Sequence, residues 1–350
     1  MKAIDTRYNQ ANEIVKYRFF EELENDEDGK DPKTVKMFVN ALHEFEVATG
    51  FKDFKKYNSD WAIIFKDHMN DKRNKNTGQN ISKSYYYHYL GFVRQFFEWL
   101  VENEKDYAKI KKRDIRYLNT TRNEKNQARA TSYQESHNIQ DILATIRMMP
   151  ETTEIEIRNK ALMSLFVLTT PRISSMQEAR VGKIRYFEDY DIWAFMQDPR
   201  LQNTKASQNI TAFFIGEVDD IIQNVLKWKA YLESKGFKSK DYLFPKITPS
   251  FTKVGTTEML LTKDYIHSET QIRAVVREAY KLNGLKYIKP HNFRHSMERH
   301  VRKTSKDPVN TNIALAENYG QNNGFSVLVD SYGGDSMGER ARLMKAIELE

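Results

Sequence analysis

The run His291-Asn292-Phe293-Arg294-His295 decides the fold when it is considered together with three distant segments of the chain. These segments are TTPRISS with Arg172, LQNTKASQN with Lys205, and DSYGG with Tyr332. Two arginines, a lysine and a histidine supply positive charge and hydrogen-bond donors for an anion, and a tyrosine hydroxyl near them could attack it. Each of these residues has an ordinary structural explanation when taken alone. The prediction therefore depends on their order along the chain.

Length and composition indicate a globular protein with room for two hydrophobic cores. The chain has 350 residues, of which 40% are hydrophobic and 29% charged. It has no cysteine, which excludes disulfides, thiolate nucleophiles and cysteine-based zinc sites. The longest apolar run, Ala161 to Leu168, is too short to cross a bilayer, and the N-terminus lacks an apolar signal region. We expect a cytoplasmic protein without a membrane partner.

Basic residues gather in one short stretch of the first half of the chain. The net charge is +7 and the isoelectric point is near 9.1, which favours a polyanionic partner. Between residues 105 and 129 nine basic residues face three acidic ones. A solvated surface is the alternative explanation, but such a cluster also suits contact with a phosphate backbone. The residues predicted to bind DNA are Arg94, Lys109, Lys111, Lys112, Arg113 and Arg116.

The N-terminal third is predicted to be a helical domain over residues 1–118. Helical periodicity covers segments near 9–23, 32–49, 59–71 and 84–103. The last of these carries an apolar stripe that fits a core better than a ligand site. In the preceding helix the buried stripe is expected to include Trp61, Ile64, Phe65 and Met69. A polar and basic linker without large apolar residues is predicted at 119–131.

The second domain is predicted to span residues 132–350 and to combine helices with a few strands. Helical patterns cover 138–149, 154–168, 218–232, 263–282, 290–303, 309–318 and about 336 to the end. Aromatic and β-branched segments at 183–187, 192–196 and 210–215 indicate strands, with Lys205 in the turn between the last two. The fold class is therefore mainly α with a small β-sheet.

His291 and Arg294 are predicted to lie on one face at the start of a helix. Pro290 favours the first helical turn, and a spacing of three brings the two side chains together. Free backbone N–H groups and the helix dipole at such a terminus favour an anion. Arg172 follows an apolar helix and a Thr-Thr-Pro corner. Its planar guanidinium group could bind two phosphate oxygens at once. Structural roles as a helix cap or a surface ion pair remain the alternatives.

Lys205 and Tyr332 are the candidates for proton transfer and nucleophilic attack. A lysine at a hairpin tip can contact a phosphate or, with a lowered pKa, donate a proton. A tyrosine has an ordinary pKa of about 10 and becomes a useful nucleophile when cations stabilise the phenolate. Tyr332 is one of 19 tyrosines, so its place after the helix with Arg294 matters more than its identity.

With these residues in order, the chain resembles the tyrosine recombinase, or phage integrase, family over most of its length. PRIS matches the first arginine motif at Arg172, TK gives Lys205, HNFRH matches the second motif at His291 and Arg294, and SYG gives Tyr332 as the nucleophile. The chain departs from the family pattern at Pro171 and Ser175, where a glycine and an acidic residue are usual.

The resemblance leaves one catalytic position open. The family's sixth catalytic residue is usually a histidine or a tryptophan, and this chain has neither at that place. Gln321 fits the position by its glycine neighbour, Asn323 by its distance from the tyrosine, and Phe325 by the local pattern. Tyr319 is a second candidate for the nucleophile.

The resemblance also implies a mechanism and partners. Tyr332 would form a 3′-phosphotyrosine link with a scissile DNA phosphate, without a metal or nucleotide cofactor. A helical, SAM-like core-binding domain and an α+β catalytic domain would clamp double-stranded DNA as a C. The protein would act as a homotetramer, and possible accessory proteins would bend the DNA.

The amphipathic segment Met337–Glu350 would then dock on a neighbouring protomer or, as the alternative, on its own domain. The expected role is integration or excision of a mobile element. A non-cleaving DNA-binding protein of this fold and a topoisomerase-like relaxing enzyme are the alternatives.

Overall fold

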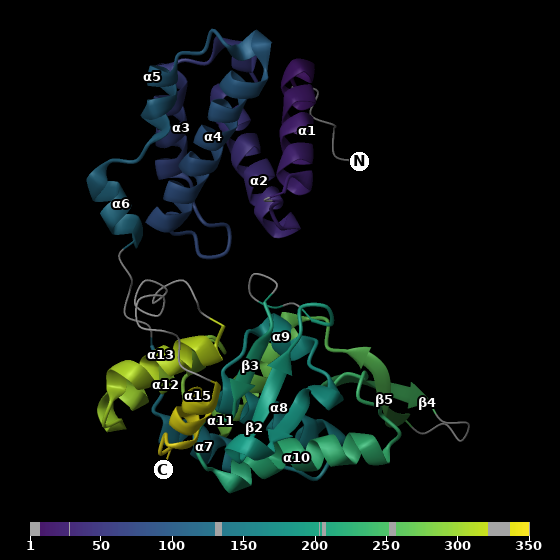
Figure 1. Ribbon diagram of the computed structural model, residues 1–350. Helices are drawn as coiled ribbons and strands as arrows, with labels where there is room; N and C mark the ends of the chain where they lie inside the picture. Colours follow the sequence, from purple (N-terminus) through teal and green to yellow (C-terminus); the bar gives the residue numbers. More distant parts are fainter. Residues whose placement is uncertain are drawn as a thin grey trace. The chain divides into compact units, whose positions relative to one another are not determined.

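The chain forms two compact units that divide between residues 132 and 133 (Figure 1). The computed structural model describes residues 8–27, 29–129, 135–202, 204, 208–251, 257–320 and 337–349. Over these residues the chain is mainly helical with two small antiparallel sheets. The predicted fold class is confirmed. No described helix combines the length and apolar character that crossing a bilayer requires.

The first unit contains only helices among its described elements. The aromatic ring of Phe45 lies at its centre, with ring centroids of Phe65 and Phe97 each 5.3 Å away. The apolar stripe of α4 is buried as predicted, but Ile64 on α3 is 43% exposed, so its predicted place in the core was wrong. The helices are α1 (Gln10–Asn25), α2 (Pro32–Thr49), α3 (Ser59–Asp71), α4 (Lys83–Asn103), α5 (Lys112–Ile115) and α6 (Arg122–Arg129). Short 3-10 segments lie at Phe54–Lys56, Lys105–Tyr107 and Arg116–Leu118.

Helix α6 occupies most of the stretch that was predicted to be an irregular linker. The backbone N–H of Glu124 donates to the Thr121 hydroxyl at 3.2 Å, and the Thr121 N–H donates back to the Glu124 carboxylate at 2.7 Å. This reciprocal pair of hydrogen bonds is a capping box, and the Thr-x-x-Glu spacing is its signature in the sequence. The Tyr86 hydroxyl of α4 also donates to Glu124, at 3.2 Å. The sequence interpretation missed this helix because it considered only the lack of large apolar residues.

A buried polar network joins α1 to α2. The Lys16 ammonium lies 2.6 Å from the fully buried Glu46 carboxylate, and the Asn12 amide donates to the same carboxylate at 3.3 Å. Asn12 also donates to the Lys52 carbonyl at 3.0 Å and accepts from the Phe54 N–H at 3.0 Å. Because water cannot reach these groups, each depends on the others for its hydrogen bonds.

Replacing Glu46 by alanine is expected to destabilise the first unit by about 3–5 kcal/mol, because it removes the buried carboxylate that pairs with Lys16 and accepts from Asn12. Amide hydrogen exchange of α2 in the full chain measures this as faster exchange, with helix α8 (Glu154–Thr169) of the second unit as internal reference. The matched control is Glu13→Ala, which removes the 45% exposed partner of the same lysine and should cost less than about 1 kcal/mol. Equal effects of the two variants would contradict the expectation.

The second unit builds two small sheets into a helical body. Strands β1 (Ile184–Phe187), β2 (Ile192–Gln197) and β3 (Ile210–Phe213) lie at the three predicted strand segments and form an antiparallel meander. Strands β4 (Pro245–Phe251) and β5 (Thr257–Tyr265) form a separate hairpin sheet. The helices are α7 (Ile139–Met148), α8 (Glu154–Thr169), α9 (Ile173–Gln177), α10 (Asp219–Ser234), α11 (Glu269–Leu282), α12 (Asn292–Thr304), α13 (Pro308–Asn318) and α15 (Met337–Lys345).

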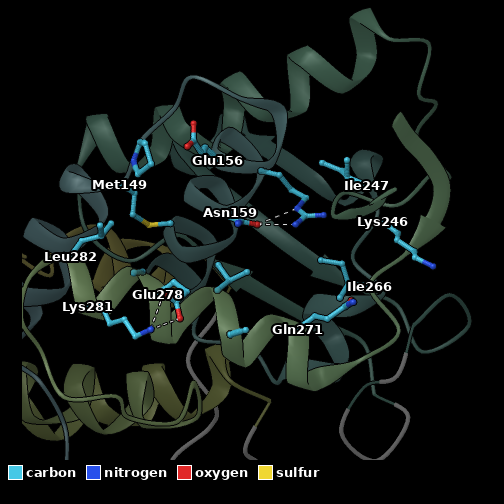
Figure 2. A pocket seen from close by; sticks show the side chains of 15 residues that line it. Met149, Glu156, Asn159, Lys246, Ile247, Ile266, Gln271, Glu278, Lys281 and Leu282 are labelled. Carbon is cyan, nitrogen blue, oxygen red and sulfur yellow. Dashed lines mark hydrogen bonds and ion pairs between the residues drawn. The ribbon is translucent and has the colours of Figure 1, made fainter. Parts of the chain in front are cut away.

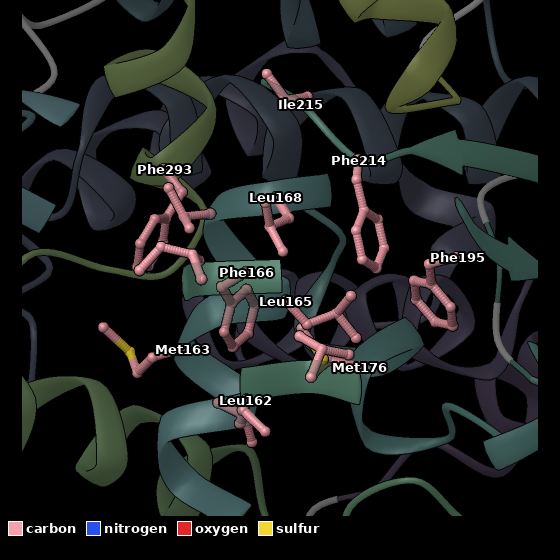
Figure 3. Close-up of a cluster of buried hydrophobic side chains, with 14 of the residues drawn as sticks. Leu162, Met163, Leu165, Phe166, Leu168, Met176, Phe195, Phe214, Ile215 and Phe293 are labelled. Carbon is pink, nitrogen blue, oxygen red and sulfur yellow. The ribbon is translucent and has the colours of Figure 1, made fainter. Parts of the chain in front are cut away.

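Helix α8 is the centre of the second core (Figure 3). Every residue from Ala161 to Thr169 is buried, so the helix is surrounded by protein on all sides. Phe166 stacks on Phe293 of α12, with ring centroids 5.6 Å apart and ring planes within 10°. This contact anchors the start of α12 beside the end of α8, although 127 residues separate the two rings in sequence.

The helix predicted over 263–282 was wrong in its first part. Residues up to Tyr265 belong to β5, and α11 begins only at Glu269 after Ser268. In β5, Leu260 pairs with Thr248 and Leu261 with Ile247 of β4. Tyr265 pairs with Pro245 of β4, so strand pairing extends through residues 263–265, which the sequence pattern had joined to the following helix.

Helix α15 packs on its own unit, beside α13 (Figure 1). Ala341 and Met344 are buried, and so is Ile347 just beyond the helix, whereas Met337 is 40% exposed. The Gly216 N–H donates to the Met344 carbonyl at 2.9 Å. In this structure the apolar face of the helix is therefore covered within the same protomer, which was the alternative to docking on a neighbour.

Candidate active site

The end of α8 places Arg172. A capping box of Thr153 and Glu156 starts the helix, and Pro171 prevents its continuation past Thr170. Thr170 adopts the left-handed conformation, with φ 40° and ψ 48°, which is unfavourable for a β-branched residue. This sharp corner turns the chain so that Arg172 becomes the N-cap of the short helix α9.

Two glutamine amides hold α9 in place. Gln177 donates to the carbonyls of Ile266 and His267, both at 2.8 Å. Gln202, from the segment between β2 and β3, donates to the Ser175 carbonyl at 3.3 Å. Thus the helix that begins at Arg172 is tied at one side to the end of β5 and at the other to the β2–β3 connection.

Arg294 on α12 reaches across to the same corner. Its Nε donates to the Thr170 carbonyl at 2.9 Å, and its Nη2 donates to the Tyr319 carbonyl at 3.4 Å. The side chain is 2% exposed, and its guanidinium lies over the Tyr319 ring at 4.8 Å. The remaining nitrogen, Nη1, is buried and has no hydrogen-bond partner among the described residues. A buried donor without a partner costs free energy, which an incoming oxygen would recover.

His291 stands at the N-cap position of α12 and stays accessible to solvent. Partial burial lowers its pKa, and the charges of Arg294, His295 and Arg172 lower it further. The His291 imidazole is therefore neutral at pH 7, with a ring nitrogen free to accept a proton. The charges of Arg172 and Arg294 both act on His291, and Arg294 bonds the Thr170 carbonyl two residues before Arg172, so the three side chains lie in one region. Their catalytic roles stay a prediction.

Arg172 and Arg294 both have a lowered pKa but keep their positive charge. Burial lowers the pKa of Arg172, and burial followed by the charge of Arg172 lowers that of Arg294 to about 10. Both guanidinium groups stay charged at pH 7. The Arg172 side chain forms no ion pair or hydrogen bond with any described residue. No carboxylate of a described residue forms an ion pair with either guanidinium, so these two cations are suited to an oxyanion.

Several predicted site residues lie outside the described residues. These are Lys205, Gln321, Asn323, Phe325 and Tyr332. The strands on either side of Lys205 are described, and Gln197 pairs with Ile210 at the open end of the β2–β3 pair.

Tyr319 has a structural place that makes it a poor nucleophile. It is 2% exposed, and burial raises the pKa of its hydroxyl far above the ordinary range. Its neighbour Asn318 donates to the Phe213 carbonyl at 3.0 Å and accepts from the Phe213 N–H at 2.7 Å, which ties the end of α13 to β3. The buried Tyr319 ring therefore supports the Arg294 guanidinium, which lies over its face. The sequence interpretation had no signal for this role or for those of Asn318 and Gln202, because each arises from a distant contact.

The residues predicted to bind DNA lie on the first unit. Lys109, Lys111, Lys112, Arg113 and Arg116 are exposed, while Tyr107, Ile110, Ile115 and Leu118 between them are buried. In the segment from residue 109 to residue 116, the basic side chains therefore point to solvent. Lys112 lies 3.5 Å from Glu102 in an exposed pair of small energetic value, and Arg113 lies 3.5 Å from the half-buried Asp114. Arg94 differs, because it is partly buried and pairs with Glu98 at 2.8 Å.

Comparison with known proteins agrees with this geometry. The family model described as "Phage integrase family" matches residues 133–309, a range that contains Arg172, Lys205, His291 and Arg294. No curated protein matches the sequence significantly.

Three solved structures share this fold at low sequence identity. One is a lambda integrase dimer bound to a COC′ core site, with 12% identity, a TM-score of 0.55 and coverage of 88% of this chain and 94% of the other. A second is XerH site-specific recombinase in a post-cleavage complex with palindromic difH, with 12% identity, a TM-score of 0.52 and coverage of 99% and 88%. A third is the Tn1549 transposon integrase with transposon right-end DNA, with 12% identity, a TM-score of 0.53 and coverage of 94% and 98%.

Proposed function

The chain belongs to the phage integrase family of tyrosine recombinases, and from this premise we propose that it breaks and rejoins double-stranded DNA at specific sites through a 3′-phosphotyrosine intermediate. The observation that carries the proposal is the group formed by Arg172, His291 and Arg294. Two charged guanidinium groups, one with a buried and unpartnered N–H donor, converge on a neutral histidine at a helix N-terminus.

The proposed reaction is a transesterification. The Tyr332 oxygen attacks the scissile phosphorus and forms a phosphotyrosine bond, while the bond from phosphorus to the 5′ oxygen breaks. His291 accepts the phenol proton, and Lys205 donates a proton to the leaving 5′ oxygen. Arg172 and Arg294 bind the non-bridging oxygens and stabilise the added charge of the transition state. Gln321 is proposed as a further hydrogen-bonding residue, with Asn323 or Phe325 as alternatives. Rejoining reverses these steps with a second 5′ hydroxyl.

The arrangement of domains follows the same proposal. Residues 1–118 bind the core of the recombination site, 119–131 form a basic connection that includes α6, and 132–350 form the catalytic domain. The protein acts on DNA as a homotetramer in which α15 leaves its own unit and docks on a neighbour, with accessory DNA-bending proteins as further partners. Integration or excision of a mobile element is the proposed role, because joining two specific sites is what such an element requires.

A pool of nicked duplexes with randomised sequence tests the function and identifies the target site in the same experiment. Cleavage near a nick releases a short fragment, so the rejoining step is lost and the covalent protein–DNA complex accumulates. We expect denaturing capture to recover such complexes, sequencing of their DNA to give a common motif, and mass spectrometry to place the nucleotide on Tyr332. Recovery of bound but never covalently linked DNA would instead indicate a non-cleaving protein of this fold. Relaxation of supercoiled DNA without a common motif would indicate a topoisomerase-like enzyme.

The basic segment of the first unit should determine the salt dependence of DNA binding. Each phosphate that the protein neutralises contributes a slope of about −0.9 to log K against log salt. Reversing the charge of Lys111, Lys112 and Arg113 together should therefore flatten the slope by about 2–3. Fluorescence anisotropy over a range of salt concentrations measures it. The matched control reverses three exposed lysines of the other unit, Lys227, Lys238 and Lys240, and should leave the slope nearly unchanged. An unchanged slope in the first variant would place the basic segment off the DNA.

A further inference from the structure

A second concave site lies away from the candidate active site, near the opposite end of α8 (Figure 2). Its cavity measures about 600 Å³ and is formed by the end of α7, the start of α8, strand β4 and helix α11. Cavities of this volume are typical of sites for small organic ligands. The apolar part of the lining includes Met149, Ile247, Ile266, Val275, Ala279 and Leu282.

The wall of this cavity contains a buried arginine that lacks an acidic partner. Arg158 is only 9% exposed. Its Nε and Nη2 donate to the side-chain oxygen of Asn159 at 3.2 and 3.0 Å, and its Nη1 donates to the Pro245 carbonyl at 3.0 Å. Figure 2 shows the two bonds to Asn159. All three acceptors are neutral, and no carboxylate of a described residue lies within ion-pair distance of the guanidinium.

This arrangement leaves the positive charge of Arg158 uncompensated. Burial is the only cause that shifts its pKa, which falls to about 10, so no nearby carboxylate stabilises the charged form. A guanidinium has five N–H groups, and three of those of Arg158 are used in the bonds to Asn159 and Pro245. One N–H on each Nη nitrogen remains available. Buried arginines are rare without a paired anion, because desolvation of the charge is costly.

The acidic side chains of the lining are already engaged. Glu278 pairs with Lys281 at 2.7 Å. Glu156 accepts from the backbone N–H groups of Thr152 and Thr153, at 3.0 and 2.9 Å, as part of the cap of α8. Lys246 adds an exposed positive charge to the lining. The lining therefore combines an apolar surface with a net positive charge.

We propose that this cavity binds a small organic carboxylate, with the carboxylate group against Arg158 and its hydrocarbon part against the apolar wall. A carboxylate would supply the acceptor and the negative charge that Asn159 and Pro245 do not supply. The apolar body would exclude water from Met149, Ile266 and Val275, which strengthens the charged contact. The site does not depend on the proposed recombinase activity, since it shares no residue with the active site.

The full-length protein is titrated with octanoate and with phenylbutyrate, and in parallel with the alcohols that have the same carbon skeletons. Isothermal titration calorimetry and ligand-observed NMR should show saturable binding of the carboxylates at or below about 10 mM, with the alcohols about tenfold weaker or more. Arg158→Gln keeps an amide donor but removes the charge, and should weaken carboxylate binding to the level of the alcohols. The matched control is Arg277→Gln, which removes an exposed charge from α11 outside the lining and should leave binding unchanged.

A second variant decides the matter if Arg158→Gln does not fold. Ala274 lines the cavity, and Ala274→Phe should fill it and abolish binding of the carboxylates while the melting temperature stays near that of the wild type. The proposal is overturned if neither carboxylate binds at about 10 mM, or if the alcohols bind equally well. It is also overturned if Arg158→Gln folds and binds carboxylates with unchanged affinity, or if Ala274→Phe does not affect their binding.

Discussion

Replacing Tyr332 by phenylalanine is expected to abolish the covalent protein–DNA adduct while the Kd for the same DNA stays within about twofold. The phenol oxygen is the only atom of that side chain that can form an ester with the scissile phosphate, and no other change accompanies its removal. Denaturing gels of nicked substrate measure the adduct, and anisotropy measures the Kd. A loss of this kind removes the chemical step completely, so it is the largest effect that we expect from any single substitution.

Tyr319→Phe is the matched control for Tyr332→Phe. The Tyr319 hydroxyl is buried and has no hydrogen-bond partner among the described residues, so its removal should change neither folding nor adduct formation substantially. The carbonyl of residue 319 would still accept from Arg294. An adduct that persists in Tyr332→Phe and disappears in Tyr319→Phe would assign the nucleophile to the other tyrosine. Adducts in both variants would contradict the proposed mechanism.

Arg294→Ala is expected to slow cleavage by about 10²–10³-fold, because it removes a preorganised donor and a positive charge from the transition state. Arg294→Lys should recover little of this rate. A lysine keeps the charge, but a single ammonium on a flexible stem cannot bond the Thr170 carbonyl and present a separate N–H to the phosphate as the planar guanidinium does. Single-turnover cleavage of nicked substrate measures the rates.

Stability must be measured beside the rate, because Arg294 is buried. Loss of the bonds to the carbonyls of Thr170 and Tyr319 leaves two buried acceptors unpaired, and thermal unfolding shows whether the variants stay folded at the assay temperature. Arg302→Ala on the same helix is the matched control, since Arg302 is exposed in the last turn of α12 and should leave cleavage unchanged. A folded Arg294→Ala protein that cleaves at the wild-type rate would remove Arg294 from the site.

Prediction from the sequence succeeded where structure follows local periodicity. The buried apolar stripe of α4 and the strands on either side of Lys205 were predicted correctly, because helical spacing and β-rich composition depend only on residues close in sequence. Prediction from the sequence failed at a boundary between a strand and a helix, and at a helix start that only two residues indicate. The last residues of β5, 263–265, were taken for the start of a helix, and the capping box at Thr121 was overlooked.

The order of Arg172, Lys205, His291-x-x-Arg294 and Tyr332 determined the family and the candidate chemistry from the sequence alone. The helix start just after Pro290 and the corner at Pro171 were equally local, because proline restricts its own backbone and that of its neighbour. Only the tertiary structure decided the partners of these side chains. The bond from Arg294 to the Thr170 carbonyl spans 124 residues, and the support of Arg294 by the Tyr319 ring and the unpaired charge of Arg158 likewise depend on distant segments. Burial and hydrogen bonding between such segments follow from the packing of the whole core around α8, which no local pattern contains.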